Sequence, residues 1–534
     1  MRALVAQATE SLCYPTHALP VDIFRVFVGL LSSAYFFHLF LQVADFSGPD
    51  GLIDHDLTRQ LFWYTRIGLF GPGMTAVTFR VIFLVAAIAS WALVLGYRVK
   101  PMATALFLVA VSAYRWNFLV IYVDDAIVHL VLFWLVLLPI GRTLVLSEWL
   151  RDRGIAVERW KRELVPGGTV RCFLVNLSLV YLVAGLWKWT SPMWRDGTAL
   201  YAALRMPISY VPDFWRPEQL PVLRIANYGA MVLEPLIPLM LILPRNHRLK
   251  WALFAGCVAF HLGIVATMMI PYANLACLAA GPIIFRHEIM AWLGQSQPYA
   301  SDVRGRTELC WSTRSALSFV AVLMLAMAAE ARVPSWRFPS RQERQAQRSY
   351  VATERSGMVL VASTVADKRE SDGRVGFLKS EHNVFYTPLW FIGIAQSYRL
   401  FDWIDDRNFH ARYKITELSA HGAVHYVDPE ELFPPTLRAV LLQGYLHDVT
   451  WGRVPRNRAA EFKVGLAARF ADRFCRTHRN TGQVEVQSQL ERIKARGVVA
   501  SEDAQLLMMF ACQHGRALLE FPHNDAARSL AAAR

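Results

Sequence analysis

Three side chains that could exchange protons lie within strongly apolar stretches of the sequence: Lys188, Glu234 and His261. A lysine acts as a base only as the neutral amine, and an apolar environment favours that form because it desolvates the charged one. A neutral imidazole can pass a proton between its neighbours. These residue types therefore suggest a polar cluster among membrane helices, in which Lys188 could be an amine held in a low-dielectric pocket.

Each of the three residues also has a structural interpretation. Lys188 lies between Trp187 and Trp189, and Trp and Lys both gather at membrane interfaces, where lysine reaches towards the lipid headgroups. Lys188 and Glu234 could instead form an ion pair, because a charge buried in lipid is costly unless it is paired. A lone histidine such as His261 is often a core residue with satisfied hydrogen bonds. The sequence leaves the catalytic and the structural interpretations open.

The composition is typical of a membrane protein. The chain has 534 residues, 54% of them hydrophobic, and a mean hydropathy of +0.28. Its formal net charge is +14, but the basic residues cluster between apolar runs, as they do in the cytoplasmic loops of membrane proteins. We therefore expect membrane lipids, and no nucleic acid, as partners.

Nine apolar runs predict the membrane-spanning helices that position these side chains. They cover residues 21–41, 76–96, 102–121, 124–140, 170–188, 225–243, 251–270, 272–285 and 315–329. In the first run Asp22 and Arg25 are three residues apart, so a helix places them on one face, where they can pair. Asp124 and Asp125 open the fourth run, where capping and the helix dipole explain acidic residues without any chemistry.

The distribution of charge predicts how the helices are oriented. The positive-inside rule assigns the basic loops to the cytoplasm; these are residues 98–100, 142–162, 245–250 and 286–306. The acidic loop 45–56, the Asp124–Asp125 turn and the connection 190–223 fall on the other side. We therefore predict a protein of the cell inner membrane with a cytoplasmic N-terminus and with Lys188 near the non-cytoplasmic end of its helix.

Residues 333–534 predict an extracytoplasmic soluble domain that follows a transmembrane domain of residues 1–332. This part is more polar and mixes strand and helix patterns, which predicts an α+β fold. The expected strands are residues 358–364 and 413–418, and the expected helices are residues 457–475 and 501–519. Cys475 and Cys512 would lie in an oxidising compartment, where they could pair.

Residues 181–189 read Tyr-Leu-Val-Ala-Gly-Leu-Trp-Lys-Trp, and residues 194–200 read Trp-Arg-Asp-Gly-Thr-Ala-Leu. These stretches resemble the vitamin K-dependent γ-carboxylase family and, more broadly, the bacterial horizontally transferred transmembrane (HTTM) proteins. That family has an Ala-Gly-x-x-Lys motif followed by a Trp-x-x-Gly turn. Three further similar features are Glu234-Pro235 within a span, Phe260-His261-Leu262, and Asp22-Ile-Phe-Arg25 at the start. The resemblance covers residues 20 to about 330.

The resemblance implies a cofactor and a substrate. In the carboxylase, the lysine that matches Lys188 deprotonates vitamin K hydroquinone, and oxygen converts the anion into a stronger base that removes a γ-proton from glutamate, so that carbon dioxide can add. A reduced quinone is thus the expected cofactor, bound beside Trp187, Trp189 and Trp194, and a secreted protein or peptide is the expected substrate; no metal is expected. The chain departs from the family at residues 123–127, which hold no histidine where the carboxylase has one, and in residues 333–534.

Two functions are therefore to be distinguished. The first is a quinol-linked, γ-carboxylase-like membrane enzyme, a lyase or ligase, that modifies extracytoplasmic proteins or peptides. The resemblance makes Lys188 its base, with His261 and Glu234 as supporting groups. The second is a non-enzymatic maturation or export factor for a secreted peptide, in which the membrane part supports the outer domain and Lys188–Glu234 is structural. A transporter is less well supported, because the span pattern shows no internal repeat.

Overall fold

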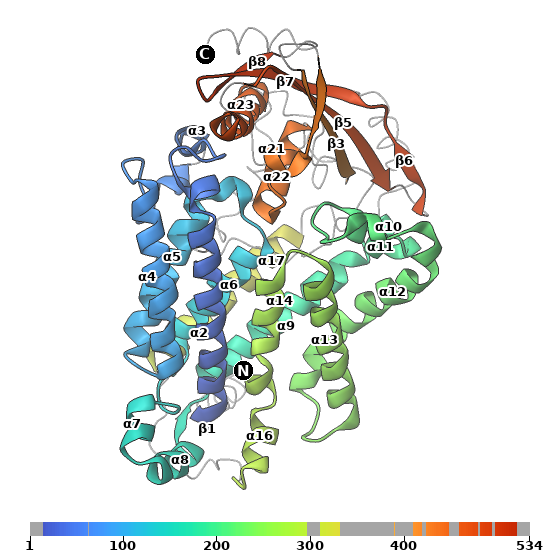
Figure 1. Ribbon diagram of the computed structural model, residues 1–534. Helices are drawn as coiled ribbons and strands as arrows, with labels where there is room; N and C mark the ends of the chain where they lie inside the picture. Colours follow the sequence, from blue (N-terminus) through green and yellow to red (C-terminus); the bar gives the residue numbers. More distant parts are fainter. Residues whose placement is uncertain are drawn as a thin grey trace.

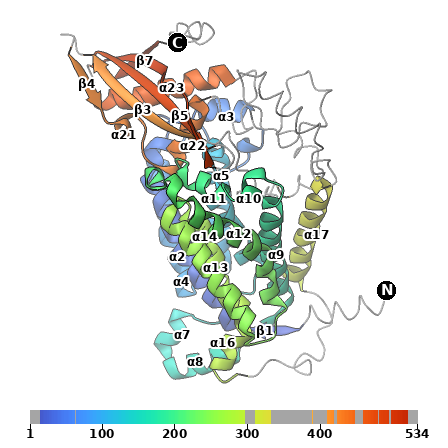
Figure 2. The ribbon, with the colours of Figure 1, turned by 90° about the vertical axis from the view of Figure 1, so that its right-hand side faces the viewer.

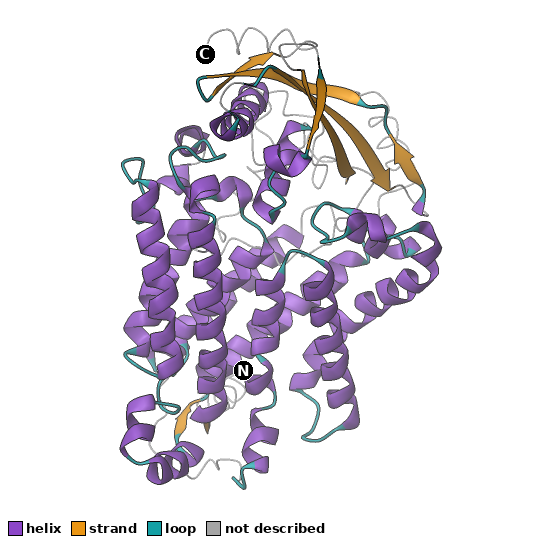
Figure 3. Ribbon diagram, in the orientation of Figure 1, coloured by secondary structure: helices purple, strands orange, loops and turns teal. Residues whose placement is uncertain are grey.

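A bundle of roughly parallel and antiparallel helices carries a twisted β-sheet at one end in the computed structural model of the chain (Figure 1). The structure describes residues 14–61, 63–295, 310–331, 389, 409–418, 423–447, 459–478, 481–493 and 497–520. Figure 3 separates the two kinds of secondary structure: the helices fill the bundle, and the large sheet is confined to the C-terminal part.

Six helices in the described part of the chain are long and apolar enough to cross a membrane. They are α2 (Ala18–Leu41), α4 (Ala76–Leu95), α9 (Gly168–Lys188), α12 (Leu220–Leu236, flanked by η5, Pro217–Gln219, and η6, Ile237–Leu241), α13 (Arg248–Thr267) and α17 (Trp311–Ala331). The other three predicted spans are also helical, as α5 (Val99–Trp116), α6 (Val123–Leu137) and the pair α14 (Pro271–Ala279) and α15 (Gly281–Ile284). Several membrane-length helices are thus confirmed, and the count of nine spans stays a prediction.

Apolar side chains and the buried ion pair of Asp22 and Arg25 help to hold the bundle together. Phe24 of α2 lies among the buried residues of a core that includes Phe79 and Phe83 of α4. At the start of α2, the Nε atom of Arg25 donates to Asp22 at 2.7 Å, and both side chains are fully buried. The predicted pairing of these two residues is confirmed. Asp22 also accepts the backbone N–H groups of residues 141–143, so the pair fixes the loop after α6.

The two ends of the bundle differ in what they carry. At the end away from the large sheet lie α7 (Leu146–Arg151), α8 (Arg153–Arg162), α16 (Arg286–Trp292) and the small sheet of β1 (Pro15–His17) and β2 (Leu164–Pro166) (Figure 1). At the sheet end lie η1 (Val43–Ser47), α3 (His55–Leu61), η2 (Trp63–Arg66), η3 (Phe118–Val120), α10 (Pro192–Asp196), α11 (Ala199–Arg205) and η4 (Pro212–Phe214). The basic α7–α8 region and α16, which belong to the predicted cytoplasmic loops 142–162 and 286–306, therefore share one end.

Among its described residues, the C-terminal part combines a large antiparallel sheet with three helices. The strands β3 (Phe409–Leu418), β4 (Val424–Val427), β5 (Gln483–Ile493), β7 (Gln505–Gln513) and β8 (Arg516–Glu520) follow the order β4-β3-β5-β7-β8, and β6 (Val499–Ser501) also pairs with β5. The helices are α21 (Pro429–Leu432), α22 (Leu437–Leu446) and α23 (Ala459–Thr477). The α+β character, the strand at 413–418 and the helix at 457–475 are confirmed. The strand expected at 358–364 lies outside the described residues.

The predicted helix at residues 501–519 is wrong, because this segment forms the hairpin β7–β8. Met508, Phe510 and Cys512 are buried at a spacing of two, which is the period of a strand. His514 and Gly515 have φ angles of 53° and 79°, as the tight turn of a hairpin requires. A disulfide joins Cys512 of β7 to Cys475 of α23, so the expected pairing is present.

The C-terminal part packs closely on the sheet end of the bundle (Figure 2). One apolar cluster contains Phe46 and Leu119 from the bundle together with Tyr445 and Phe470 from the C-terminal part. Arginines on α23 contact the acidic loop after α2: Arg473 donates to Asp45 at 2.8 Å, and Arg469 and Arg476 donate to backbone oxygens of residues 49–51. The two parts therefore share a core as well as a charged rim.

Candidate functional site

Lys188 and Glu234 form a buried ion pair. Lys188 is the last residue of α9, and Glu234 lies in the last turn of α12. The Nζ atom of Lys188 is 2.5 Å from Oε2 of Glu234, and the two side chains are only 3% and 6% exposed. The amine is therefore held inside the protein rather than extended towards a lipid surface. The structure brings these two predicted site residues together.

Close packing of α9 against α12 makes this pair possible. A Cβ atom on Gly185 would lie 2.5 Å from Cδ and 2.9 Å from the nitrogen of Pro235. Only glycine allows such an approach, and it places Lys188, one turn further along α9, within reach of Glu234. The Ala-Gly-x-x-Lys motif of α9 and the Glu-Pro pair of α12 thus face each other where the two helices cross.

The three predicted cofactor-binding tryptophans take different positions. The ring of Trp194 has its centroid 5.2 Å from the Nζ atom of Lys188, a cation–π distance. Trp187 is buried, whereas Trp189 is half exposed and donates its indole N–H to the carbonyl oxygen of Met231 at 3.3 Å. Trp194 therefore covers the amine, and Trp189 faces outwards.

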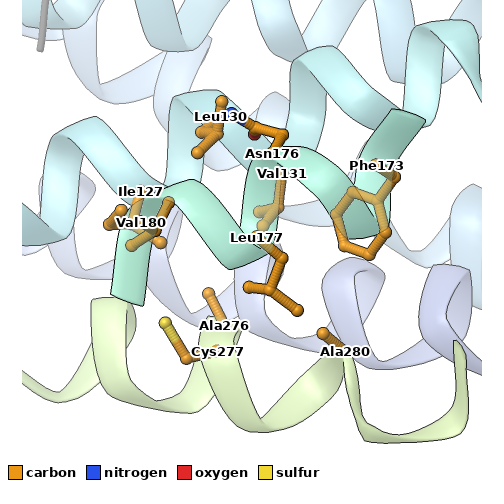
Figure 4. Close-up of a pocket in the computed structure, with 10 residues that line it drawn as sticks. All are labelled: Ile127, Leu130, Val131, Phe173, Asn176, Leu177, Val180, Ala276, Cys277 and Ala280. Atoms are coloured by element: carbon orange, nitrogen blue, oxygen red, sulfur yellow. The ribbon is translucent and has the colours of Figure 1, made fainter. Parts of the chain in front are cut away.

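A reduced quinone does not fit against the pair as these residues lie. The Nζ atom of Lys188 is in contact with Glu234 and with the face of Trp194, and the exposed fractions of the paired side chains leave no surface for a ring to touch. The small cavity in Figure 4 lies elsewhere, among α6, α9 and α14, and is lined by Ile127, Leu130, Val131, Phe173, Asn176, Leu177, Val180, Ala276, Cys277 and Ala280. Its volume, about 20 Å³ open to the centre of a water molecule, suits a single water.

His261 belongs to a separate hydrogen-bonded chain. Asn274 of α14 donates its amide to the carbonyl oxygen of Ile270 at 2.6 Å, so its Oδ1 atom is left to face Nδ1 of His261 at 2.8 Å. This arrangement places a proton on Nδ1. The Nε2 atom of His261 then accepts the hydroxyl proton of Tyr181 at 2.6 Å. The hydroxyl also lies 3.8 Å from the sulfur of Cys257.

The two polar sites follow each other along one face of α9. Tyr181 and Lys188 are seven residues apart, two helical turns or about 10 Å along the axis. The predicted polar residues therefore do not form one cluster. Tyr181 and Asn274 are site residues that the sequence reasoning missed, although the spacing of Tyr181 from Lys188 on one helix face could have indicated the first of them.

Asp124 and Asp125 act at helix ends, as predicted, but not at the same helix. Asp125 accepts the backbone N–H of Tyr122 at 2.9 Å and so caps α6. Asp124 instead accepts the N–H of Ala273 at 2.7 Å and caps α14.

A second buried lysine–glutamate pair lies at the other end of the bundle. The Nζ atom of Lys250 is 2.6 Å from Oε1 of Glu288, and the side chains are 5% and 0% exposed. Lys250 also lies 4.7 Å from the ring centroid of Phe285. The sequence reasoning assigned Lys250 to a loop, whereas it lies in the first turn of α13 and points inwards. In geometry the pair Lys250–Glu288 closely matches Lys188–Glu234.

The fold and the site define a class: a helical protein with several helices of membrane-spanning length, buried ion pairs between them and a C-terminal sheet. In the described part of the chain, no three His, Cys, Asp or Glu side chains gather as metal ligands. No protein-family model, no curated protein and no solved structure matches the chain. The resemblance to γ-carboxylases thus stays a prediction carried by the motifs around Lys188.

Proposed function

We propose that this chain is an integral membrane protein that uses Lys188 and Glu234 as an acid–base pair to modify an extracytoplasmic protein or peptide. The observation that carries the proposal is the 2.5 Å contact between two buried, oppositely charged groups at the end of α9. Intramembrane ionisable residues are costly and are a functional hypothesis by default.

The pair can supply a neutral amine without creating an unpaired charge. As an ammonium, Lys188 is no base. Movement of one proton along the short hydrogen bond to Glu234 gives a neutral amine beside a neutral acid, and the net charge of the site is unchanged. An apolar site opposes isolated charges far more than it opposes such an exchange. The amine can then accept a proton from an acidic group of the substrate, and the ammonium that forms pairs with the anion left behind. Reaction requires Trp194 or α12 to move, because the pair is covered.

Two features support an extracytoplasmic substrate. Lys188 lies at the end of α9 nearer the C-terminal part, which carries the disulfide Cys475–Cys512. Disulfides form and persist in oxidising compartments outside the cytoplasm. The basic helix α8, together with α7 and α16, lies at the opposite end, where the positive-inside rule expects the cytoplasm.

A maturation or export factor without catalytic activity is the second candidate. It is favoured by the closed state of the pair, which suits a purely structural tie between α9 and α12, and by the core that the C-terminal part shares with the bundle. In this case the outer surface binds a secreted peptide, and Lys188 takes no part in chemistry.

A charge-preserving substitution distinguishes the two candidates. Lys188→Arg keeps the positive charge beside Glu234, but an arginine stays protonated and cannot act as a base. If the pair is catalytic, this variant inserts and unfolds like the wild type, while mass spectrometry of the host's extracytoplasmic proteins shows the loss of a modification. If Lys188→Arg leaves every modification and every host function intact, the catalytic proposal is wrong.

A further inference from the structure

We infer that the C-terminal part positions His261 from a distance, with Arg438, Asp124 and Asn274 as the positioning residues. The connection runs through the first turn of α6 and the start of α14. The connection is a property of the fold and does not depend on the acid–base role proposed for Lys188 and Glu234.

The first step is an arginine that enters the bundle. Arg438 lies at the start of α22, and its guanidinium is 2.6 Å from Oδ1 of Asp125. The side chains are 11% and 4% exposed, so this is a largely buried pair. The hydroxyl of Tyr35 in α2 donates to the same carboxylate oxygen at 2.7 Å. Arg438 therefore fixes the first turn of α6 against both α2 and the C-terminal part.

The second step passes from α6 to α14 through the neighbouring residue. The residue that precedes α14, Ile270, makes no side-chain cap. Asp124 replaces the missing cap by accepting the N–H of Ala273. A capping interaction of this kind contributes about 1 kcal/mol to a helix end. Because Asp124 and Asp125 are adjacent, a movement that releases Asp125 from Arg438 also moves the cap of α14.

The third step joins α14 to the histidine. Asn274 lies one residue after the capped Ala273, and its amide group is fixed by Ile270 at one end and by His261 at the other. A shift in the first turn of α14 therefore changes the orientation of the imidazole and its hydrogen bond to Tyr181. Docking of the C-terminal part is thus coupled to the geometry of the His261 site.

Two cysteines beside this site serve as reporters. Cys257 is buried and contacts Tyr181, and Cys277 of α14 lines the small cavity in Figure 4. When Cys13, Cys172 and Cys310 of the full-length protein are replaced by alanine, Cys257 and Cys277 are the two cysteines that remain free. The rate at which a membrane-permeant maleimide labels Cys277 then measures how tightly α14 is held.

The test compares arginines that differ in what they contact. Arg438→Gln removes the cation from Asp125, and we expect at least a several-fold faster labelling of Cys277. Arg473→Gln is the matched control, because Arg473 contacts Asp45 and Glu431 outside the network; we expect wild-type labelling. Arg438→Lys keeps the charge and should restore slow labelling. An intact Cys475–Cys512 disulfide on a non-reducing gel shows that the C-terminal part is folded in each variant.

A second pair of variants tests the cap itself. Asp124→Asn keeps an oxygen for the N–H of Ala273 and should label like the wild type, whereas Asp124→Leu removes the acceptor and should label faster. Equal labelling of Cys277 in Arg438→Gln and the wild type, or equal acceleration by Arg473→Gln, overturns the inference. Neither result depends on enzymatic activity. The inference can therefore fail while the proposed function stands, and the proposed function can fail while the inference stands.

Discussion

Gly185 of α9 lies directly against Pro235 of α12, and this contact sets the distance at which the two helices cross. The space beside Gly185 is filled by the proline ring and by the Cβ atom of Glu234, 3.1 Å from the position of an added Cβ. The glycine and the proline thereby bring the charged ends of Lys188 and Glu234 together. Four residues therefore meet at this helix crossing: the uncharged Gly185 and Pro235, and the charged Lys188 and Glu234.

Gly185→Ala should separate the pair. The added methyl group forces α12 away, and overpacking of this kind costs about 1–3 kcal/mol. Thermal unfolding of the detergent-solubilised protein measures the loss. Gly229→Ala is the control, because a Cβ on Gly229 of α12 meets no atom within 4 Å. Equal stability of the two variants would show that the crossing is less tight than described.

The disulfide Cys475–Cys512 should stabilise the C-terminal part. Its cysteines are separated by 37 residues in sequence, and closing a loop of that length stabilises by roughly 3–4 kcal/mol in the chain-entropy account. Cys475→Ser should therefore lower the unfolding midpoint clearly, and a reductant should lower that of the wild type to the same value. Cys310→Ser, at an exposed free cysteine, should change nothing. Insensitivity of the wild type to reduction would contradict the prediction.

Acid should destabilise the C-terminal part through His447. Burial, helped by Lys463 and Arg492, lowers the pKa of His447 to about 3, whereas an unfolded histidine titrates near its ordinary value of about 6.5. The folded state thus binds a proton less readily than the unfolded state, so stability is full above about pH 6.5 and falls as the pH drops towards 3. At about pH 5 the loss is roughly 2 kcal/mol.

His447→Gln isolates this contribution. Glutamine can keep a hydrogen bond to the hydroxyl of Tyr413, which lies 3.0 Å from Nε2 of His447, but it does not titrate. Unfolding midpoints of the full-length variant should therefore depend less on pH than those of the wild type. Parallel pH profiles for the two proteins would rule out His447 as the origin.

The orientation in the membrane gives a further prediction. A reporter inserted after Gly294, just beyond α16, should face the cytoplasm, and a reporter at the C-terminus should face the other side. Enzymatic reporters that are active on one side only make the comparison in intact cells. Two reporters active on the same side would reject the topology and, with it, an extracytoplasmic substrate.

The sequence alone predicted the structure correctly where the pattern of apolar residues or the spacing of two charged residues determined it. Each of the nine apolar runs contains helix in the structure, one of them as the pair α14 and α15, and the spacing of Asp22 and Arg25 predicted their contact. The hairpin β7–β8 was missed because Leu507, Met509 and Ala511 are also apolar and hide the alternation that the buried residues Met508, Phe510 and Cys512 follow. Asn274 and Glu288 could not be assigned, because their partners lie on other helices and are brought near only by the tertiary fold.

The most direct test of the acid–base proposal compares the two buried lysine–glutamate pairs. Replacing a buried ion pair by apolar residues of similar volume is often neutral for stability, so Lys188→Met with Glu234→Leu and Lys250→Met with Glu288→Leu should both fold. The measurement is the mass spectrum of the host's extracytoplasmic proteins and peptides in cells that carry either double variant. We predict that a modification disappears only with the Lys188–Glu234 double variant. Identical spectra for both double variants and the wild type would contradict a catalytic role for Lys188.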